Sequence, residues 1–138
     1  MTRPRAVAYG AAVDGLRKLL AASIALRSLT NFAKPFVAGS RFVIVGRLCG
    51  GVASAVIAPL FGIAMLIYAA GLWSARPWAR PVAVFYALWA TVNVVLFPFL
   101  EGVPPRFSPW MYLVFAVPGI VIPWLAVWAL GATRRAAR

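Results

Sequence analysis

The amino-acid sequence predicts an all-α protein that crosses a membrane as a four-helix bundle. The 138-residue chain is 64% hydrophobic and has a mean hydropathy of +0.90, whereas roughly 45–50% of the residues of a soluble globular domain are apolar. Three uncharged apolar stretches are long enough for the roughly 20 helical residues that cross a hydrocarbon core. They predict spans at about 48–73, 82–100 and 110–131. Residues 1–138 are expected to form one integral membrane domain.

The first helix, expected at about 13–33, is polar and amphipathic. Its large aliphatic side chains recur at helical spacing, at Leu16, Leu19, Leu20 and Ile24. Basic residues interrupt the pattern, at Arg17, Lys18 and Arg27. The segment therefore either crosses the membrane as a short polar span or lies flat on its surface as an amphipathic helix.

The distribution of basic residues favours a crossing. With four spans, the side that holds both termini carries Arg3, Arg5, Arg17, Lys18, Arg76, Arg80, Arg134, Arg135 and Arg138. The opposite side carries Lys34, Arg41, Arg47 and Arg106. Because basic residues collect on the cytoplasmic side, we expect both termini in the cytoplasm, in a bacterial inner membrane. The residues expected to contact anionic lipid head groups are Arg76, Arg80, Arg134 and Arg135.

The net charge of +12 results from fourteen basic residues against Asp14 and Glu101. The basic residues bracket apolar spans and form no patch interleaved with aromatic residues, so membrane lipids rather than nucleic acid are the expected contacts. Asp14 precedes Arg17 and Lys18 by one helical turn, a spacing that predicts local ion pairs.

The second span begins in the stretch "GRLCGGVASAVIAPLFG", where small residues fall four apart. In a helix they would form one bare strip, made of Gly46, Gly50, Ser54, Ala58 and Gly62. Small residues let helix backbones approach closely in lipid. The strip is expected to pack either on another helix of the same bundle or on a partner protein, a second copy of the chain or a lipid.

The third span offers a matching small face. Ala83 and Ala87 form this face, and Asn93 lies on the same side. A buried amide inside a membrane needs hydrogen-bond partners. The expected partners are Ser54 or the backbone carbonyl that Pro59 frees on the facing helix.

The fourth span contains "VPGIVIP", in which Pro118 and Pro123 can kink the helix or break it. Discontinuous helices line substrate sites in transporters, although prolines are also ordinary in membrane helices. A charged residue inside a span faces a partner or a water-filled cavity unless it reaches the head groups. A polar path through the protein would involve Arg27, Asn31 and Asn93.

The composition argues against an enzyme. The chain has no histidine, so it lacks the imidazole that serves most often as a general base or metal ligand. Asp14 and Glu101 are expected at opposite ends of the bundle, which rules out a carboxylate pair. The single cysteine, Cys49, forms no internal disulfide and no CxxC motif. No catalytic residue, cofactor or metal is expected.

The stretches "GLWSARPWARP" and "YALWATVNVVLFP" resemble a pattern in small four-span bacterial membrane proteins of unknown function. The resemblance covers roughly residues 66–98, and it implies a four-helix fold without an activity. The length is also similar to that of the small multidrug resistance exporters, which rely on a membrane-embedded carboxylate in the first helix. Asp14 is the candidate here, and its position beside two basic residues near the surface departs from that pattern.

Two functions remain open from the sequence. The first is a non-catalytic subunit or scaffold that packs against partner helices in a larger membrane complex. The second is a small homo-oligomeric transporter or channel for an anionic or small polar solute, with arginine lining that favours anions. The partner is expected to be a membrane protein or a second copy of the chain.

Overall fold

The computed structural model describes residues 3–102 and 108–136. The chain forms α1 (Arg3–Ala33), the 3₁₀ turn η1 (Lys34–Phe36), β1 (Phe42–Ile44), β2 (Arg47–Cys49), α2 (Gly51–Trp73), α3 (Ala79–Leu100) and α4 (Pro109–Ala136). Among the described residues, three helices are long and apolar enough to cross a membrane, namely α2, α3 and most of α4. The prediction of an all-α bundle with three clear spans and a more polar first helix is confirmed.

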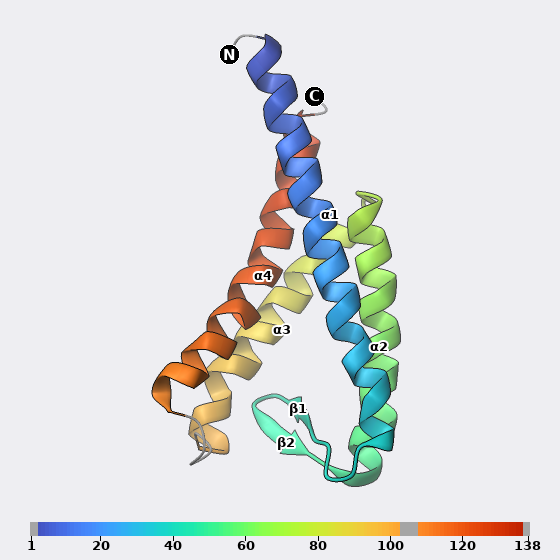
Figure 1. Cartoon of the computed structure of the whole chain (residues 1–138), viewed down its shortest axis with the longest axis vertical. Coiled ribbons are helices and arrows are strands. Elements are labelled where there is room, and N and C mark those ends of the chain that lie inside the picture. The colour runs from blue at the N-terminus through green and yellow to red at the C-terminus, as the bar shows by residue number, and fades with distance from the viewer. Residues whose placement is uncertain (1–2, 103–107, 137–138) are drawn as a thin grey trace.

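The four helices form two pairs that spread apart toward one end (Figure 1). The helix α1 packs along α2, and α3 packs along α4, whereas few contacts join α2 to α3. Contacts between α1 and α4 hold the pairs together near the end where α1 begins and α4 ends (Figure 1). We call this the terminal end of the bundle, and we call the opposite end, where the pairs separate, the hairpin end.

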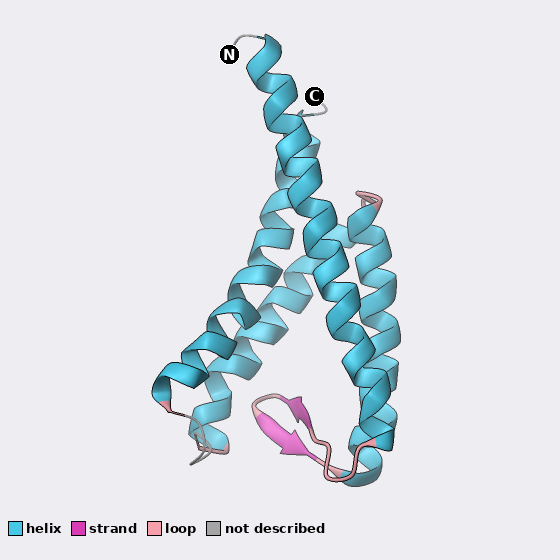
Figure 2. Cartoon of the chain, viewed as in Figure 1, coloured by secondary structure: helices cyan, strands magenta, loops and turns pink. Residues whose placement is uncertain are grey.

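A β-hairpin lies between the two helix pairs at the hairpin end (Figure 2). Its strands β1 and β2 are antiparallel, with Phe42 paired to Cys49 and Ile44 paired to Arg47. The connecting residues Val45 and Gly46 both have positive φ, 49° and 76°, as a two-residue type I′ turn requires. This hairpin is not among the elements predicted from the sequence.

The predicted small-residue strip is wrong at its first two positions. Gly46 is in the hairpin turn, and Gly50 has the extended conformation φ −116°, ψ −173° that precedes α2. The second span therefore begins at Gly51 rather than Leu48, because Arg47–Cys49 form the strand β2, which pairs with β1. The rest of the strip is helical and buried, at Ser54, Ala58 and Gly62.

The other helix boundaries also differ from the predicted spans. The helix α1 begins at Arg3 rather than near residue 13, so it extends beyond α2 at the terminal end (Figure 1). The helices α3 and α4 extend a few residues past the predicted limits. α4 runs through Pro118 and Pro123 as one helix, so a discontinuous fourth helix was the wrong alternative.

The core is densest near the terminal end, where all four helices contribute. Its aromatic and aliphatic members include Ile24 of α1 and Tyr68 and Leu72 of α2. Alanines line the opposing surfaces of α3 and α4, with Ala83, Ala87, Ala126 and Ala129 fully buried. Side chains this small allow the close backbone approach on which helix packing in lipid depends.

We expect Gly62→Ala to destabilise the contact between α1 and α2. A Cβ at Gly62 would lie 3.0 Å from the Phe32 ring and 3.2 Å from the Ser28 carbonyl oxygen of α1. Overpacking of this kind costs about 1–3 kcal/mol, against which the better helix propensity of alanine restores up to about 1 kcal/mol. A net loss of about 1 kcal/mol is expected in detergent unfolding followed by tryptophan fluorescence.

Gly119→Ala is the matched control for this change. Gly119 is also helical, but its Cβ would meet only Val94 Cγ2 at 3.4 Å, an ordinary van der Waals contact. The control should be neutral or stabilising. Equal effects at both glycines would contradict a close α1–α2 contact at Gly62.

Candidate functional site

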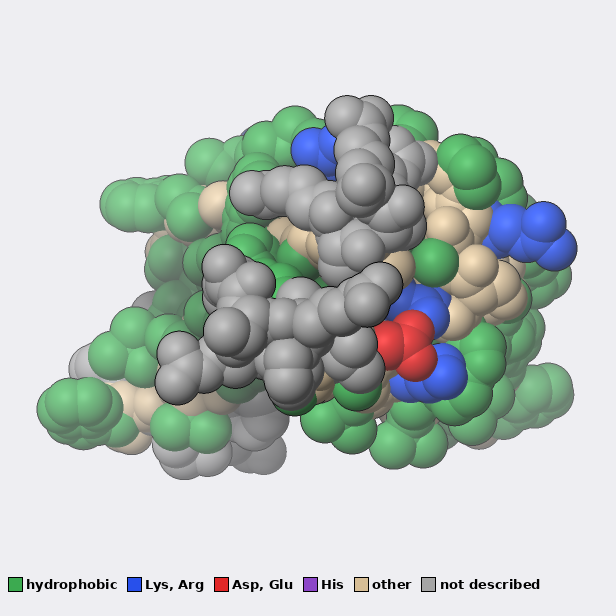
Figure 3. All heavy atoms as spheres, turned by 90° about the horizontal axis from the view of Figure 1, so that it is seen from above, with side chains coloured by type: hydrophobic (Ala, Val, Ile, Leu, Met, Phe, Trp, Pro, Cys, Tyr) green, Lys and Arg blue, Asp and Glu red, His purple; other side chains and the backbone are tan. Residues whose placement is uncertain are grey.

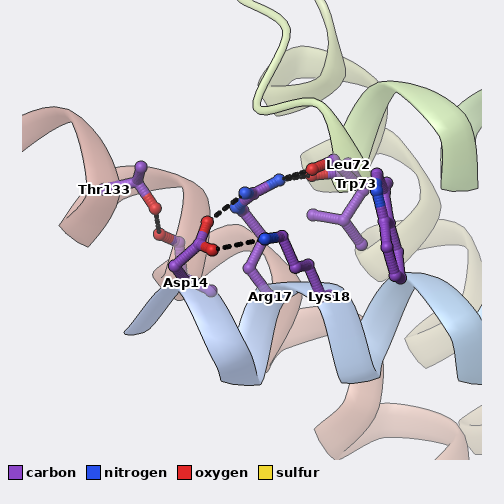
Figure 4. A network of polar contacts seen from close by, with 7 residues as sticks. Asp14, Arg17, Lys18, Leu72, Trp73 and Thr133 are labelled. Atoms are coloured by element: carbon purple, nitrogen blue, oxygen red, sulfur yellow. Dashed lines mark hydrogen bonds and ion pairs between the residues drawn. The ribbon is translucent and has the colours of Figure 1, made fainter. Parts of the chain in front are cut away.

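A polar network at the terminal end ties α1 to the last turn of α2 (Figure 4). The side chain of Arg17 is 5% exposed, and its guanidinium donates to the backbone carbonyls of Leu72 and Trp73 and to the Asp14 carboxylate. Lys18 Nζ lies 2.8 Å from the other oxygen of Asp14. The local ion pairs predicted for Asp14 are therefore confirmed.

Arg17 satisfies an intrinsic need of the helix that it contacts. The last four carbonyls of an α-helix have no partner within the helix, and they carry partial negative charge. A buried guanidinium offers several donors in a fixed plane, so Arg17 caps the C-terminus of α2 and binds Asp14 at the same time. From the sequence, Arg17 was predicted only as a basic residue of the cytoplasmic side and as a partner for Asp14.

A second polar contact holds the hairpin against α3. The Gly46 N–H donates to Asn93 Oδ1 at 3.1 Å, and Asn93 Nδ2 donates to the Trp89 carbonyl at 2.8 Å. At the end of the same helix, Glu101 Oε1 accepts from the Leu48 N–H at 3.1 Å. Asn93 is thus buried as predicted, but its partner on another element is the hairpin turn.

The predicted partners of Asn93 are wrong for a structural reason. The helices α2 and α3 separate toward the hairpin end, so the hairpin rather than α2 fills the space beside Asn93. Ser54 Oγ is buried without a hydrogen-bond partner. Ser54 instead faces the interior with Ala58 and Gly62, and the contacts of Gly62 place α1 beside this part of the strip.

The structure does not join the predicted polar path into one site. Arg27 is exposed on α1, Asn31 is half-buried on the same helix, and Asn93 bonds to the hairpin turn and to its own helix. Arg76 and Arg80 are exposed at the terminal end, where Figure 3 shows basic side chains among apolar ones. The side chains of Arg134 and Arg135 lie outside the described residues.

Six aromatic side chains line a cavity between α2, α3 and β1, which we call the aromatic cleft. Its volume is about 320 Å³, and its walls are Phe42, Ile44, Ile57, Phe61, Ala64, Met65, Tyr68, Val82, Phe85, Tyr86 and Trp89. The cleft exists because α2 and α3 make few contacts with each other. Phe85, Val82 and Ile57 are exposed, so the cleft opens on the outer surface of the bundle.

The floor of the aromatic cleft is a cluster of stacked and edge-on rings. Phe61 is central, with its ring centroid 4.7 Å from that of Trp89 and 5.3 Å from that of Phe42. Tyr86 lies 6.1 Å from Trp89 and 5.9 Å from Tyr68. These are ordinary aromatic packing distances, and they link the hairpin, α2 and α3 into one surface.

Tyr68 is the one lining residue whose polar atom is buried and unpaired among the described residues. The side chain is 1% exposed, and its hydroxyl has no hydrogen-bond partner. Such a group costs about 1–3 kcal/mol relative to a bonded one. Tyr68 is not among the site residues predicted from the sequence, where it is only one polar side chain on the apolar second span.

Comparison with known proteins adds no relative. No family model, curated protein or solved structure matches this chain. Its function therefore has to be inferred from the arrangement of its own residues.

Proposed function

We propose that this chain is a non-catalytic integral membrane subunit or scaffold, which acts through contacts that its helices make within the bilayer. The proposal rests on what the two hydrogen-bonded buried side chains Arg17 and Asn93 contact. Arg17 and Asn93 each bond to backbone atoms of another element. They stabilise the fold, and the outward faces of the spans offer apolar side chains to other molecules.

The small-residue faces support a revised location for the partner contact. The small residues of these faces are buried inside the chain, so they pack the helices of this chain against one another. They are Ser54, Ala58, Gly62, Ala83 and Ala87. A partner would meet the bulky outer faces of α2, α3 and α4, or the part of α1 that extends beyond α2. The proposal therefore does not include a partner contact at the small-residue strip of α2.

The proposed setting is a bacterial inner membrane with the terminal end in the cytoplasm. Arg17, Lys18, Arg76 and Arg80 belong to the terminal end, whereas Lys34, Arg41 and Arg47 belong to the hairpin end. The lower density of basic residues at the hairpin end agrees with the positive-inside rule. Exposed Arg76 and Arg80 are the proposed contacts with anionic lipid head groups.

The native mass and composition of the tagged protein, extracted gently from its own membrane, test this function. A companion protein in fixed stoichiometry is the expected result, and it should persist after mild washing with salt because apolar contacts are insensitive to screening. A homo-oligomer without a companion would contradict the subunit role. Liposome flux of anions, compared with flux through Arg27→Leu, would then test the transporter alternative.

A further inference from the structure

We propose that the β-hairpin is a re-entrant segment that lines a water-filled entrance, through which small anions reach the interior of the bilayer from the hairpin end. The role goes beyond a subunit that makes only helix contacts. It needs no path through the protein, because the helices pack into a dense core beyond the hairpin, around Tyr68 and Leu72. Three features of the hairpin support the entrance, namely its depth, an unpaired stretch of its backbone and the charges beside it.

The turn of the hairpin lies at the depth of the hydrocarbon core. Gly46 packs against Leu96 of α3, and its N–H bonds to Asn93. These two residues of α3 lie four and seven positions before its last residue, Leu100. At about 1.5 Å per residue, the turn is therefore about 6–10 Å from that end of the helix. Because the 22 residues of α3 extend over about 33 Å and the core is roughly 30 Å thick, the turn lies inside the core.

Phe42 of β1 gives a second measure of this depth, from α2. Its ring centroid lies 5.3 Å from that of Phe61. Phe61 is ten residues from the start of α2 at Gly51, which corresponds to about 15 Å. Since α1 ends and α2 begins at the hairpin end (Figure 1), the chain enters the core and leaves it on the same side, as a re-entrant segment does.

The free edge of β1 leaves backbone groups unpaired at this depth. Hydrogen-bonded and non-hydrogen-bonded residue pairs alternate along antiparallel strands. The Leu48 N–H points out of the hairpin to Glu101, so Val43, which is opposite Leu48 in the register, also turns its N–H and carbonyl outward. Neither of these groups of Val43 bonds to another described residue. Irregular backbone at membrane depth faces protein or water rather than lipid, so lipid is an unsuitable neighbour for this edge.

The charges around the hairpin favour water over a covering protein. Arg41 and Arg47 are exposed on the hairpin, and Glu101 is exposed beside it. Lys34 Nζ lies 4.7 Å from the centre of the Phe42 ring and donates to the Arg41 carbonyl. A protein that covered the hairpin would remove these charges from water, which is unfavourable. Three positive charges against one negative charge also attract anions.

A cavity between the hairpin, α3 and α4 forms the inner end of the entrance. Its volume is about 230 Å³, and its lining residues are Val43, Asn93, Val94, Phe97, Tyr112 and Ala116. A water molecule takes up about 30 Å³, so several fit. Besides its bonds to Gly46 and Trp89, the Asn93 amide keeps one N–H and one oxygen lone pair with which it can bind water.

Reaction of an introduced cysteine with a membrane-impermeant methanethiosulfonate reagent tests the entrance. Val45→Cys places a thiol in the turn, and Val95→Cys places one on the exposed face of α3 at about the level of Gly46. The two valines have similar exposure, 52% and 48%, and Cys49→Ser removes the native thiol from both variants. The full-length protein is labelled in native membrane vesicles, opened by freezing and thawing so that the reagent reaches both faces.

Val45→Cys should react about 100-fold faster than Val95→Cys, because only the thiolate reacts and a thiol in hydrocarbon stays protonated. Arg47→Cys on the adjoining strand should react as fast as Val45→Cys, so the result does not depend on the folding of one variant. Slow reaction at both hairpin positions would mean that lipid or another protein covers them, and it would overturn the proposal. Equally fast reaction at Val95→Cys would place this part of α3 outside the bilayer and overturn it too.

Two reagents of opposite charge test the attraction of anions. The 2-sulfonatoethyl and 2-trimethylammonioethyl methanethiosulfonates react with the same thiolate, so the ratio of their rates at Val45→Cys reports the local potential. Compared with free cysteine in solution, this ratio should favour the anionic reagent about tenfold. Arg47→Gln should lower the preference, whereas Arg80→Gln, at an exposed position of the terminal end, should not. A ratio equal to that of free cysteine, or equal effects of the two variants, would refute the attraction of anions.

Discussion

Replacing Arg17 with leucine is expected to lower the free energy of unfolding by about 3 kcal/mol. The change removes a buried guanidinium that donates to the carbonyls of Leu72 and Trp73 and to Asp14. A hydrogen bond from a charged donor contributes about 1.5–3 kcal/mol, and water at the terminal end would replace part of that loss. Unfolding in mixed detergent micelles, followed by circular dichroism, gives the measurement.

Two further variants of α1 test whether this loss comes from the contacts of Arg17. Arg27→Leu removes an exposed arginine of α1 and should change the stability by less than about 0.5 kcal/mol. Arg17→Lys keeps the charge but loses the planar fork that reaches two carbonyls and a carboxylate at once, so about half of the loss should remain. A loss at Arg17→Leu no larger than that at Arg27→Leu would refute the capping role.

The Arg17 contacts also explain how a polar helix belongs to a membrane bundle. Three charged residues, Asp14, Arg17 and Lys18, lie within two turns of α1, and a lone charge in a span is costly. Here they gather near the terminal end, where α2 ends, and they neutralise one another in part. The polar residues that made α1 ambiguous in the sequence are thus the ones that fasten it to α2.

Hydrophobicity was enough to predict the three spans, because each apolar stretch falls within or above the roughly 17–25 helical residues that cross a hydrocarbon core. It was not enough for α1, whose first turns carry Arg3 and Arg5 and show no apolar periodicity. Tyr68 could not be identified as a cleft residue from its place in the chain. Its cleft arises from the separation of α2 and α3, which is set by packing between segments distant in sequence.

The hairpin was not predicted because two conflicting signals lie side by side in the sequence, a glycine spacing typical of a helix and a composition typical of a strand. Glycines four apart suggest a helix face, and Gly46 and Gly50 fit that pattern. The preceding "RFVIV" is rich in β-branched and aromatic residues, which favour strands, and Val45 is an unusual residue for a type I′ turn. The turn is imposed by tertiary contacts, chiefly the fit of Gly46 against α3 and its bond to Asn93.

Gly46→Ala is therefore expected to cost about 3 kcal/mol and to release the hairpin from α3. Gly46 has φ +76°, where an L-residue loses about 1–2 kcal/mol. A Cβ there would also lie 2.6 Å from Leu96 Cβ and 2.9 Å from the Leu96 backbone carbon. The helix backbone cannot yield, so the hairpin must move away and its N–H must leave Asn93 Oδ1. Unfolding in detergent measures the cost, and hydrogen exchange at Gly46 measures the release.

Gly39→Ala separates the two causes of that cost. Gly39 has nearly the same φ, +71°, but a Cβ there would meet no atom within 4 Å, so only the conformational loss of about 1–2 kcal/mol is expected. The difference between the two variants measures the close approach of the hairpin to α3. Equal losses of unfolding free energy in the two variants would mean that Gly46 is needed only for its positive φ. The close packing of Gly46 against Leu96 of α3 would then contribute nothing to stability.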